Sequence, residues 1–154
     1  MENEIDISKL IHRGGIFVDV EATTPREVYE YISKRIDLPE GLTPEQLEEA
    51  LYARETVLST AVGNGIALPH ARTPIMKSED DQRIIIVYLK NPIEMNAPDE
   101  RSVSTMFILL SSNSQSHLKI LSYLANLFRN MRFRRALEAR AGESELSNLI
   151  QELA

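Results

Sequence analysis

The chain has 154 residues, 43% of them hydrophobic and 26% charged, which is typical of one globular domain with a substantial core. The absence of cysteine excludes disulfides, thiolate metal sites and cysteine nucleophiles. A net charge of −6 argues against a nucleic-acid partner, because phosphates bind to basic surfaces. No apolar run is long enough to cross a membrane and the N-terminus lacks basic residues, so we expect a cytoplasmic protein without membrane insertion.

The first third of the chain alternates apolar runs with helix-start signals. Leu10-Ile11 and Ile16–Val18, separated by two glycines, predict a brief helical turn followed by a strand. Thr24-Pro25 combines an N-cap with a proline at the first helical position. Apolar residues then recur at four-residue spacing, which predicts an amphipathic helix over 25–36.

A second helix-start signal follows a Pro-Glu-Gly break. Thr43-Pro44 places Gln46 three residues after the threonine, where it can complete a capping box. The predicted helix carries Arg54 and Glu55 in its last part. A basic residue near the end of a helix is usually only a partner of the helix dipole.

The stretch that follows predicts a turn and then a short strand. Gly63-Asn64-Gly65 indicates a tight reversal, because Asn and Gly both tolerate a positive φ. Ile66–Leu68 is extended and apolar, and Pro69 keeps Leu68 in an extended conformation. The sequence therefore predicts that His70 lies at a strand end, with Arg72 close behind it.

The second half predicts two buried strands followed by helices. Ile84–Leu89 and Val103–Leu110 are nearly continuous apolar runs, and Pro92 is predicted to end the first strand. His117 is predicted to open a leucine-rich helix, which is followed by a helix over 131–140 and a last helix from Ser144-Glu145 to Leu153. Helices that alternate with buried strands predict a layered α/β or α+β architecture in a single domain over 1–154.

Five arginines concentrate near the C-terminus. We interpret this basic cluster as solvated helix surface and not as a nucleic-acid site, because the chain as a whole is acidic. The cluster comprises Arg129, Arg132, Arg134, Arg135 and Arg140.

Several kinds of chemical site do not fit the motifs. The two glycines at 63 and 65 lack the third glycine of a dinucleotide fingerprint, and the three histidines are too far apart in sequence for a zinc motif. No nucleophile-elbow motif of a serine hydrolase is present. Histidine remains as a nucleophile, since a neutral imidazole offers a lone pair and guanidinium groups bind phosphoryl oxygens. Spacing alone also allows a purely structural role for His70.

A longer pattern resembles a known family. Glu55, Val62-Gly63 and Ile66–Ala71 stand at the spacing of the phosphohistidine signature of IIA components of the bacterial phosphoenolpyruvate-dependent sugar phosphotransferase system. The subfamily is the fructose, mannitol and nitrogen-regulatory one (EIIA type 2). The resemblance continues with a Pro-Ile ahead of Ala-Pro-Asp at 92–99 and with His117-Leu118 at the start of the leucine-rich helix.

The resemblance implies a mixed central sheet flanked by helices. From the motifs we expect no cofactor and no metal. It implies that His70 accepts phosphate from a small HPr-like phosphocarrier protein and that Arg54 and His117 support the phosphoryl group. Arg72, next to the signature, is a further candidate phosphate ligand. Two positions depart from the family pattern: Glu100 replaces a common glycine, and Ser111-Ser112 replaces a common proline or apolar residue.

Three functions stay open at this point. We expect a free-standing IIA, because the sequence contains no IIB or IIC segment, and this favours a nitrogen-regulatory type of phosphotransfer protein. The alternative is a IIA component of fructose/mannitol-type sugar uptake that passes phosphate to a IIB partner. The third reading is a purely regulatory binding module that contacts a kinase, a channel or a transcription factor.

Overall fold

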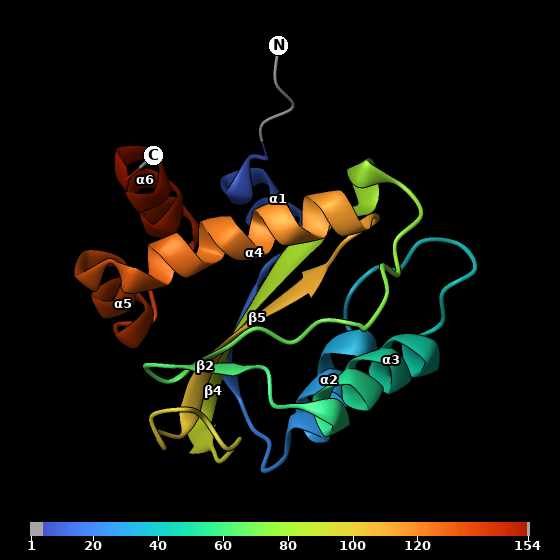
Figure 1. Ribbon diagram of the computed structural model, residues 1–154, viewed down its shortest axis with the longest axis horizontal. Coiled ribbons are helices and arrows are strands. Elements are labelled where there is room, and N and C mark those ends of the chain that lie inside the picture. Colours follow the sequence, from blue (N-terminus) through green and yellow to red (C-terminus); the bar gives the residue numbers. More distant parts are fainter. Residues whose placement is uncertain (1–4, 154) are drawn as a thin grey trace.

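The two longest strands form the centre of one mixed sheet. In the computed structural model, which describes residues 5–153, β4 (Arg83–Ile93) and β5 (Val103–Leu110) pair antiparallel. On one side β1 (Ile16–Val20) pairs parallel to β4, and on the other β3 (Ile66–Ala67) pairs parallel to β5. A last strand, β2 (Ala61–Gly63), pairs antiparallel to β3 and completes the order β1-β4-β5-β3-β2 (Figure 1).

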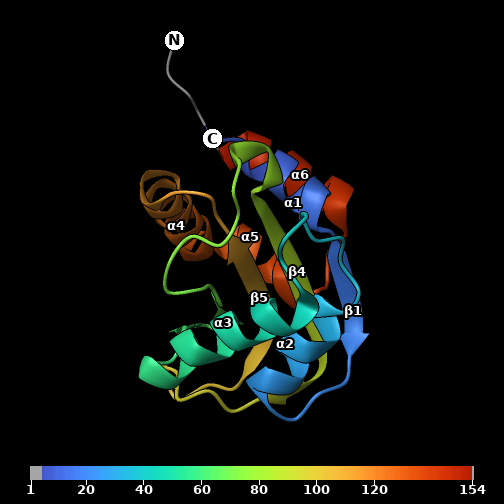
Figure 2. The same ribbon diagram turned by 90° about the vertical axis from the view of Figure 1, so that its right-hand side faces the viewer.

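Helices cover both faces of this sheet. Alternate residues of β4 point to opposite cores, as Ile84 and Ile86 do to one and Ile85 and Val87 to the other. The first core is closed by α1 (Ile7–Gly14), α4 (Ser114–Arg129), α5 (Met131–Glu138) and α6 (Glu143–Leu153). The second is closed by α2 (Pro25–Ser33) and α3 (Pro44–Val57), which lie side by side (Figure 2).

The predicted fold class is confirmed, and so are its local signals. Thr24 and Thr43 are N-caps, and each forms a complete capping box with Glu27 and Gln46, respectively. Both central strands are buried on both faces, which is why their sequences are continuously apolar. Residues 1–4 and 154 of the predicted domain lie outside the described residues.

Two predicted boundaries were wrong in ways that matter for the sheet and the site. Pro92 does not end β4, which continues to Ile93. The ladder to β5 is irregular between Tyr88 and Ile93, and a proline without an N–H is tolerated where regular pairing is interrupted. Helix α4 begins at Ser114 and not at His117, because the Asn113 side chain acts as N-cap and accepts the Ser116 N–H at 2.8 Å.

The other differences concern helix lengths. The predicted first turn is a full helix of eight residues, α1. Helix α2 ends at Ser33, three residues before the predicted end, and α5 ends at Glu138. Helix α6 begins at Glu143, one residue before the predicted start. None of the helices between residues 5 and 153 is long and apolar enough to span a membrane.

The β2–β3 hairpin turns where the sequence predicts it. Asn64 and Gly65 have φ values of 56° and 75°, as both central residues of a type I′ turn require. The Asp99 carboxylate accepts the Asn64 N–H at 2.8 Å and so holds the turn against the loop that precedes β5. The hairpin thereby places the segment that follows β3 beside the carboxyl end of β5.

Candidate functional site

His70 lies where β3 ends beside β5. Strands β3 and β5 are parallel, so their carboxyl ends meet at the same edge of the sheet, and His70 forms a single parallel bridge with Leu109. The Leu109 N–H donates to the Pro69 carbonyl at 2.9 Å, which fixes the backbone just before the imidazole. The sequence prediction that His70 occupies a strand end is confirmed.

The His70 ring has a defined tautomer. Its Nδ1 lies 2.7 Å from the Leu68 carbonyl oxygen, and a carbonyl can only accept, so Nδ1 carries the proton. In the neutral ring the lone pair is therefore on Nε2. The half-buried side chain thus presents Nε2 as its free, nucleophilic atom.

His117 lies directly beside His70. The centroids of the two rings are 4.9 Å apart, with 58° between their planes. Because α4 starts at Ser114, the His117 backbone N–H is already bonded to the Asn113 carbonyl at 3.0 Å. His117 can therefore act on a ligand only through its side chain.

Arg54 brings a positive charge to this pair of rings. It lies in the last turn of α3, where its Nη1 donates to the Leu58 carbonyl at 2.6 Å and so caps the helix. That bond uses one of the five N–H donors of the guanidinium. The charge of Arg54 lowers the pKa of both His70 and His117, so the guanidinium acts electrostatically on both rings.

Glu55 fixes the end of α3 that carries Arg54. Its carboxylate accepts the Tyr29 hydroxyl at 2.7 Å, the Thr60 hydroxyl at 2.7 Å and the Thr60 N–H at 2.9 Å. Burial, and then the charge of Glu55, raise the pKa of Tyr29, so the phenol remains a donor. One carboxylate therefore ties α3 to both α2 and the start of β2.

Both imidazoles are held neutral. Burial is the main cause that lowers the pKa of His70, and Arg54 adds to it, while the Leu68 hydrogen bond and Glu55 oppose it. Burial also lowers the pKa of His117, with further contributions from His70 and Arg54. At neutral pH the site therefore combines two neutral rings with one guanidinium.

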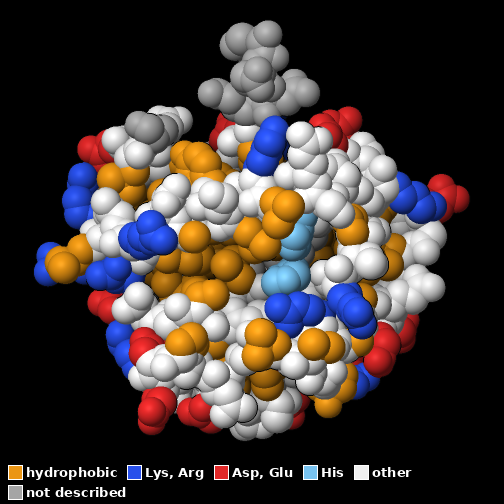
Figure 3. Space-filling view, viewed as in Figure 1, with side chains coloured by type: hydrophobic (Ala, Val, Ile, Leu, Met, Phe, Trp, Pro, Cys, Tyr) orange, Lys and Arg blue, Asp and Glu red, His pale blue; other side chains and the backbone are white. Residues whose placement is uncertain are grey.

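The surface around the site is apolar on one side and basic on the other. Figure 3 shows histidine surface in the middle of one face, with Lys or Arg side chains against it and apolar surface beside it. Leu58 at the end of α3, Val62 in β2 and Leu118 in α4 are exposed large apolar residues, with 69%, 46% and 66% of their surface accessible. Apolar surface beside a site, as in Figure 3, is typical of a protein-docking surface.

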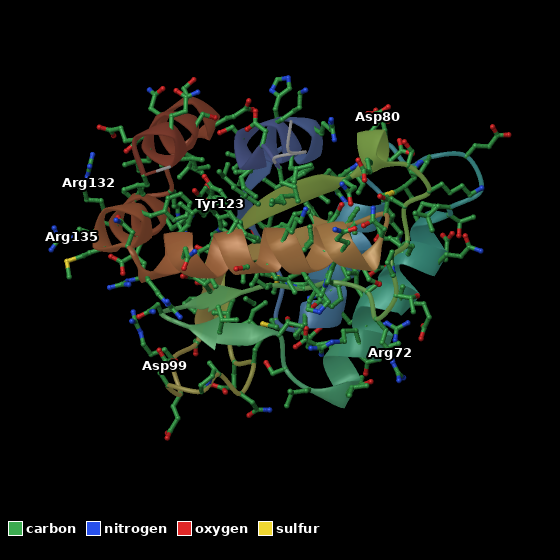
Figure 4. All side chains as sticks on the ribbon, turned by 45° about the horizontal axis from the view of Figure 1, so that its top comes forward. Arg72, Asp80, Asp99, Tyr123, Arg132 and Arg135 are labelled. Carbon is green, nitrogen blue, oxygen red and sulfur yellow. The ribbon has the colours of Figure 1, made fainter. Side chains whose placement is uncertain are left out.

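Arg72 is exposed on the loop after His70. Figure 4 shows its side chain beside α3, away from the labelled Arg132 and Arg135 at the other end of the molecule. Its charge is not among those that shift the pKa of either site histidine. Arg72 therefore stays a candidate phosphate ligand beside α3, whereas the charge of Arg54 acts on both rings.

Three arginines of the C-terminal cluster are engaged within the fold. Arg132 pairs with Glu152 at 3.1 Å, and Arg134 donates to the carbonyls of Phe128 and Arg129. Arg140 pairs with Asp19 and donates to the Leu89 carbonyl. These contacts support the interpretation of the cluster as helix surface. Among residues 5–153, no group of three or more His, Asp or Glu side chains could hold a metal ion.

Sequence reasoning missed two contributors. Glu55 entered only as a residue at the end of a predicted helix and as the first residue of a pattern, and Ser111 only as a departure from that pattern. In the structure the Ser111 hydroxyl lies 2.9 Å from Nδ1 of His117. The position of Glu55 next to Arg54, on an otherwise ordinary helix, was the available signal, whereas nothing in the local sequence marks Ser111.

With this geometry in view, the comparisons identify the family. The sequence profile described as "Phosphoenolpyruvate-dependent sugar phosphotransferase system, EIIA 2" matches residues 9–153. A match over nearly the whole chain shows that it belongs to this family, as the resemblance predicted.

Individual relatives are nitrogen-regulatory and phosphoryl-transfer proteins. The "Nitrogen regulatory protein" of Klebsiella oxytoca is 29% identical over an alignment of 155 residues, gaps included. The alignment covers 98% of this chain and 93% of that protein. "Multiphosphoryl transfer protein 1" of Escherichia coli is 27% identical over 151 residues, 96% of this chain but 18% of that larger protein.

Solved structures share the fold. The nitrogen regulatory protein IIA-Ntr of Neisseria meningitidis matches with a TM-score of 0.79 and 27% identity over 94% of this chain and 98% of that one. A mannitol IIA of E. coli, solved in complex with phosphorylated IIB, has a TM-score of 0.67 at 16% identity, over 89% of this chain and 94% of that one. At that identity the second likeness concerns the fold alone.

Proposed function

We propose that this chain accepts a phosphoryl group on Nε2 of His70 from an HPr-like phosphocarrier protein. The observation that carries the proposal is the hydrogen bond from Nδ1 to the Leu68 carbonyl, which leaves the Nε2 lone pair free next to a second imidazole and a guanidinium. Donor and acceptor must share a compartment, which we propose is the cytoplasm.

The transfer step makes one bond and breaks one. Nε2 of His70 attacks phosphorus, and the bond from phosphorus to the leaving nitrogen of the carrier breaks. Positive charge develops on the His70 ring, and the Leu68 carbonyl stabilises that charge through the Nδ1 proton. In this proposal Arg54 and His117 bind the phosphoryl oxygens, since a loose transition state needs mainly alignment and neutralisation of charge.

The decisive test identifies the phosphorylated atom. The protein, labelled with ¹⁵N in its histidines, is incubated with phosphoenolpyruvate, the general phosphotransferase enzyme and the phosphocarrier. We expect an acid-labile phosphate on Nε2 of His70, visible as coupling between ¹⁵N and ³¹P, and none on His117. Phosphate on Nδ1 of His70, or stoichiometric phosphate on His117, would contradict the assignment.

We further propose a regulatory use of the phosphorylated state. The similarity to nitrogen regulatory proteins over nearly their full length favours that branch over sugar uptake. Phosphorylation adds about two negative charges beside an apolar patch, which changes the surface that a kinase, channel or transcription factor would contact.

A deletion strain distinguishes the two branches. We expect altered ion homeostasis or nitrogen responses with normal growth on single sugars, restored by the wild-type gene. Loss of growth on one sugar, with the other responses untouched, would instead assign the chain to transport, with a IIB component as the phosphate acceptor.

A further inference from the structure

Ser111 occupies the first position after β5 and is 4% exposed. Its backbone is held from two sides. The Ser111 carbonyl accepts the N–H groups of Ile75 and Met76, each at 3.1 Å, and the next N–H, of Ser112, donates to the Gln82 side chain at 2.9 Å. These hydrogen bonds fix the backbone at Ser111 and therefore the position from which its hydroxyl projects.

The Ser111 hydroxyl meets only one partner within the described part of the chain. Its Oγ lies 2.9 Å from Nδ1 of His117 and makes no second hydrogen bond among residues 5–153. A hydroxyl can donate or accept, so the proton between the two atoms could belong to either. If His117 donated from Nδ1, the buried serine proton would have no acceptor, which is costly. The satisfied arrangement has Ser111 donating to an unprotonated Nδ1.

We propose that Ser111 is a positioning residue that fixes His117 as the tautomer with its proton on Nε2. The two neighbouring rings then have opposite tautomers. His70 has its proton on Nδ1 and its lone pair on Nε2, and His117 has the reverse. One ring presents a nucleophile and the other a donor, as transfer to His70 requires.

This arrangement suits the phosphorylated state. A phosphoryl group on His70 has three oxygens that only accept, so a neighbouring imidazole helps only if it presents an N–H. His117 is kept neutral by burial and by the charges around it, and a neutral ring has one N–H to offer. Because Ser111 assigns that proton to Nε2, no energy is spent on changing tautomer during transfer.

The tautomer is testable without any phosphate transfer. In ¹⁵N spectra of the unphosphorylated protein at pH 8, we expect Nδ1 of His117 at an unprotonated shift and Nε2 at a protonated one. The Ser111→Ala variant should lose that fixed assignment, and Ser111→Thr, which keeps the hydroxyl, should retain it. A protonated Nδ1 of His117 in the wild type would overturn the proposal, even if no variant folds.

The kinetic test rests on the proposed function. Ser111→Ala should slow phosphate acceptance about 2- to 10-fold, as expected for one neutral hydrogen bond. The matched control is Ser112→Ala, which removes a neighbouring hydroxyl that does not touch His117 and should transfer at the wild-type rate.

A double variant shows whether Ser111 acts through His117. In a His117→Ala background, Ser111→Ala should have no further effect on the transfer rate. An equal slowing in both backgrounds would overturn the positioning role. If no phosphate is accepted at all while the wild-type tautomer is as expected, the proposed function fails and the assignment of the tautomer stands.

Discussion

His70→Asn is expected to abolish phosphate acceptance while the protein stays folded. The asparagine amide can occupy the place of Nδ1 and donate to the Leu68 carbonyl, so the local hydrogen bond at 2.7 Å is replaceable. No atom in the new side chain replaces the nucleophilic Nε2. Labelling from phosphoenolpyruvate through the phosphocarrier should therefore fall to background, a loss of at least about 10³-fold, as for removal of a covalent nucleophile.

His12→Asn is the matched control for this substitution. His12 is exposed on α1, where it contacts Glu143 of α6, and it lies outside the site. The same change of residue there should leave labelling at the wild-type level. Labelling of His70→Asn at the wild-type rate would mean that another residue is the acceptor, and the proposed function would be wrong.

The His70→Asn variant should also change how the stability of the protein depends on pH. The pKa of folded His70 lies below its ordinary value, so the unfolded chain binds more protons as pH falls through about 6.5. The wild type therefore loses stability as pH falls below that value. His70→Asn should lose less over the same range, with the remainder due to His117, whose pKa is shifted in the same direction. Denaturant unfolding between pH 8 and pH 5 measures the difference.

The elements of the fold could be predicted because their signals are local. Continuous apolar, β-branched runs occur where strands are buried on both faces, as in Ile84–Leu89. Thr-Pro followed by Glu or Gln marks the start of α2 and α3, and Asn64-Gly65 marks the hairpin. Each of these signals depends on neighbours within a few residues, and the chain keeps them unchanged in the folded state.

The site could not be predicted in this way, because its residues are brought together by strand order. His70 follows β3 and Ser111 follows β5, and both lie at the same edge of the sheet because these strands are parallel neighbours. No local pattern states which strands are neighbours. The family resemblance supplied Arg54 and His117 as partners of His70, but it could not supply Ser111, where this chain departs from the family pattern.

Boundary errors had local physical causes as well. The start of α4 was predicted at His117, but Asn113 is a good N-cap and adds one turn to the helix. That turn moves His117 from the helix end to its fourth residue, where its backbone N–H is already bonded. The change matters for function, because the His117 backbone N–H is no longer available to a ligand and only its imidazole is.

Arg54→Ala is expected to slow phosphate transfer by about 10²-fold or more, as for loss of an oriented charge-stabilising donor. The guanidinium uses one N–H to cap α3 at Leu58, so the substitution removes a surface cap and leaves the cores intact. Folding should remain cooperative, with a loss of stability near 1 kcal/mol, typical for one such hydrogen bond.

The slowing of phosphate transfer by Arg54→Ala should separate into two contributions, a changed pKa of the rings and a less stabilised transition state, when it is measured at different pH values. Arg54 lowers the pKa of His70 and of His117, so its removal should raise both pKa values, and NMR titration of the ring protons measures this directly. Removal of Arg54 should restore the two pKa values only in part, because burial is the larger cause of their lowering. A raised pKa protonates the acceptor at higher pH, so the pH profile of transfer should move toward higher pH. At pH 8, where both rings are neutral, the remaining slowing reports stabilisation of the transition state alone.

Two further arginine variants complete this test. Arg54→Lys keeps the charge but not the planar fork, so it should restore the pKa values more fully than the rate. Arg135→Ala removes an exposed arginine at the far end of the molecule (Figure 4). It should change neither the pKa values of the two histidines nor the transfer rate. Arg72→Ala tests the other candidate phosphate ligand in the same assay. If Arg54→Ala transfers at the wild-type rate at pH 8 while Arg72→Ala is slow, the guanidinium that binds the phosphoryl group is that of Arg72.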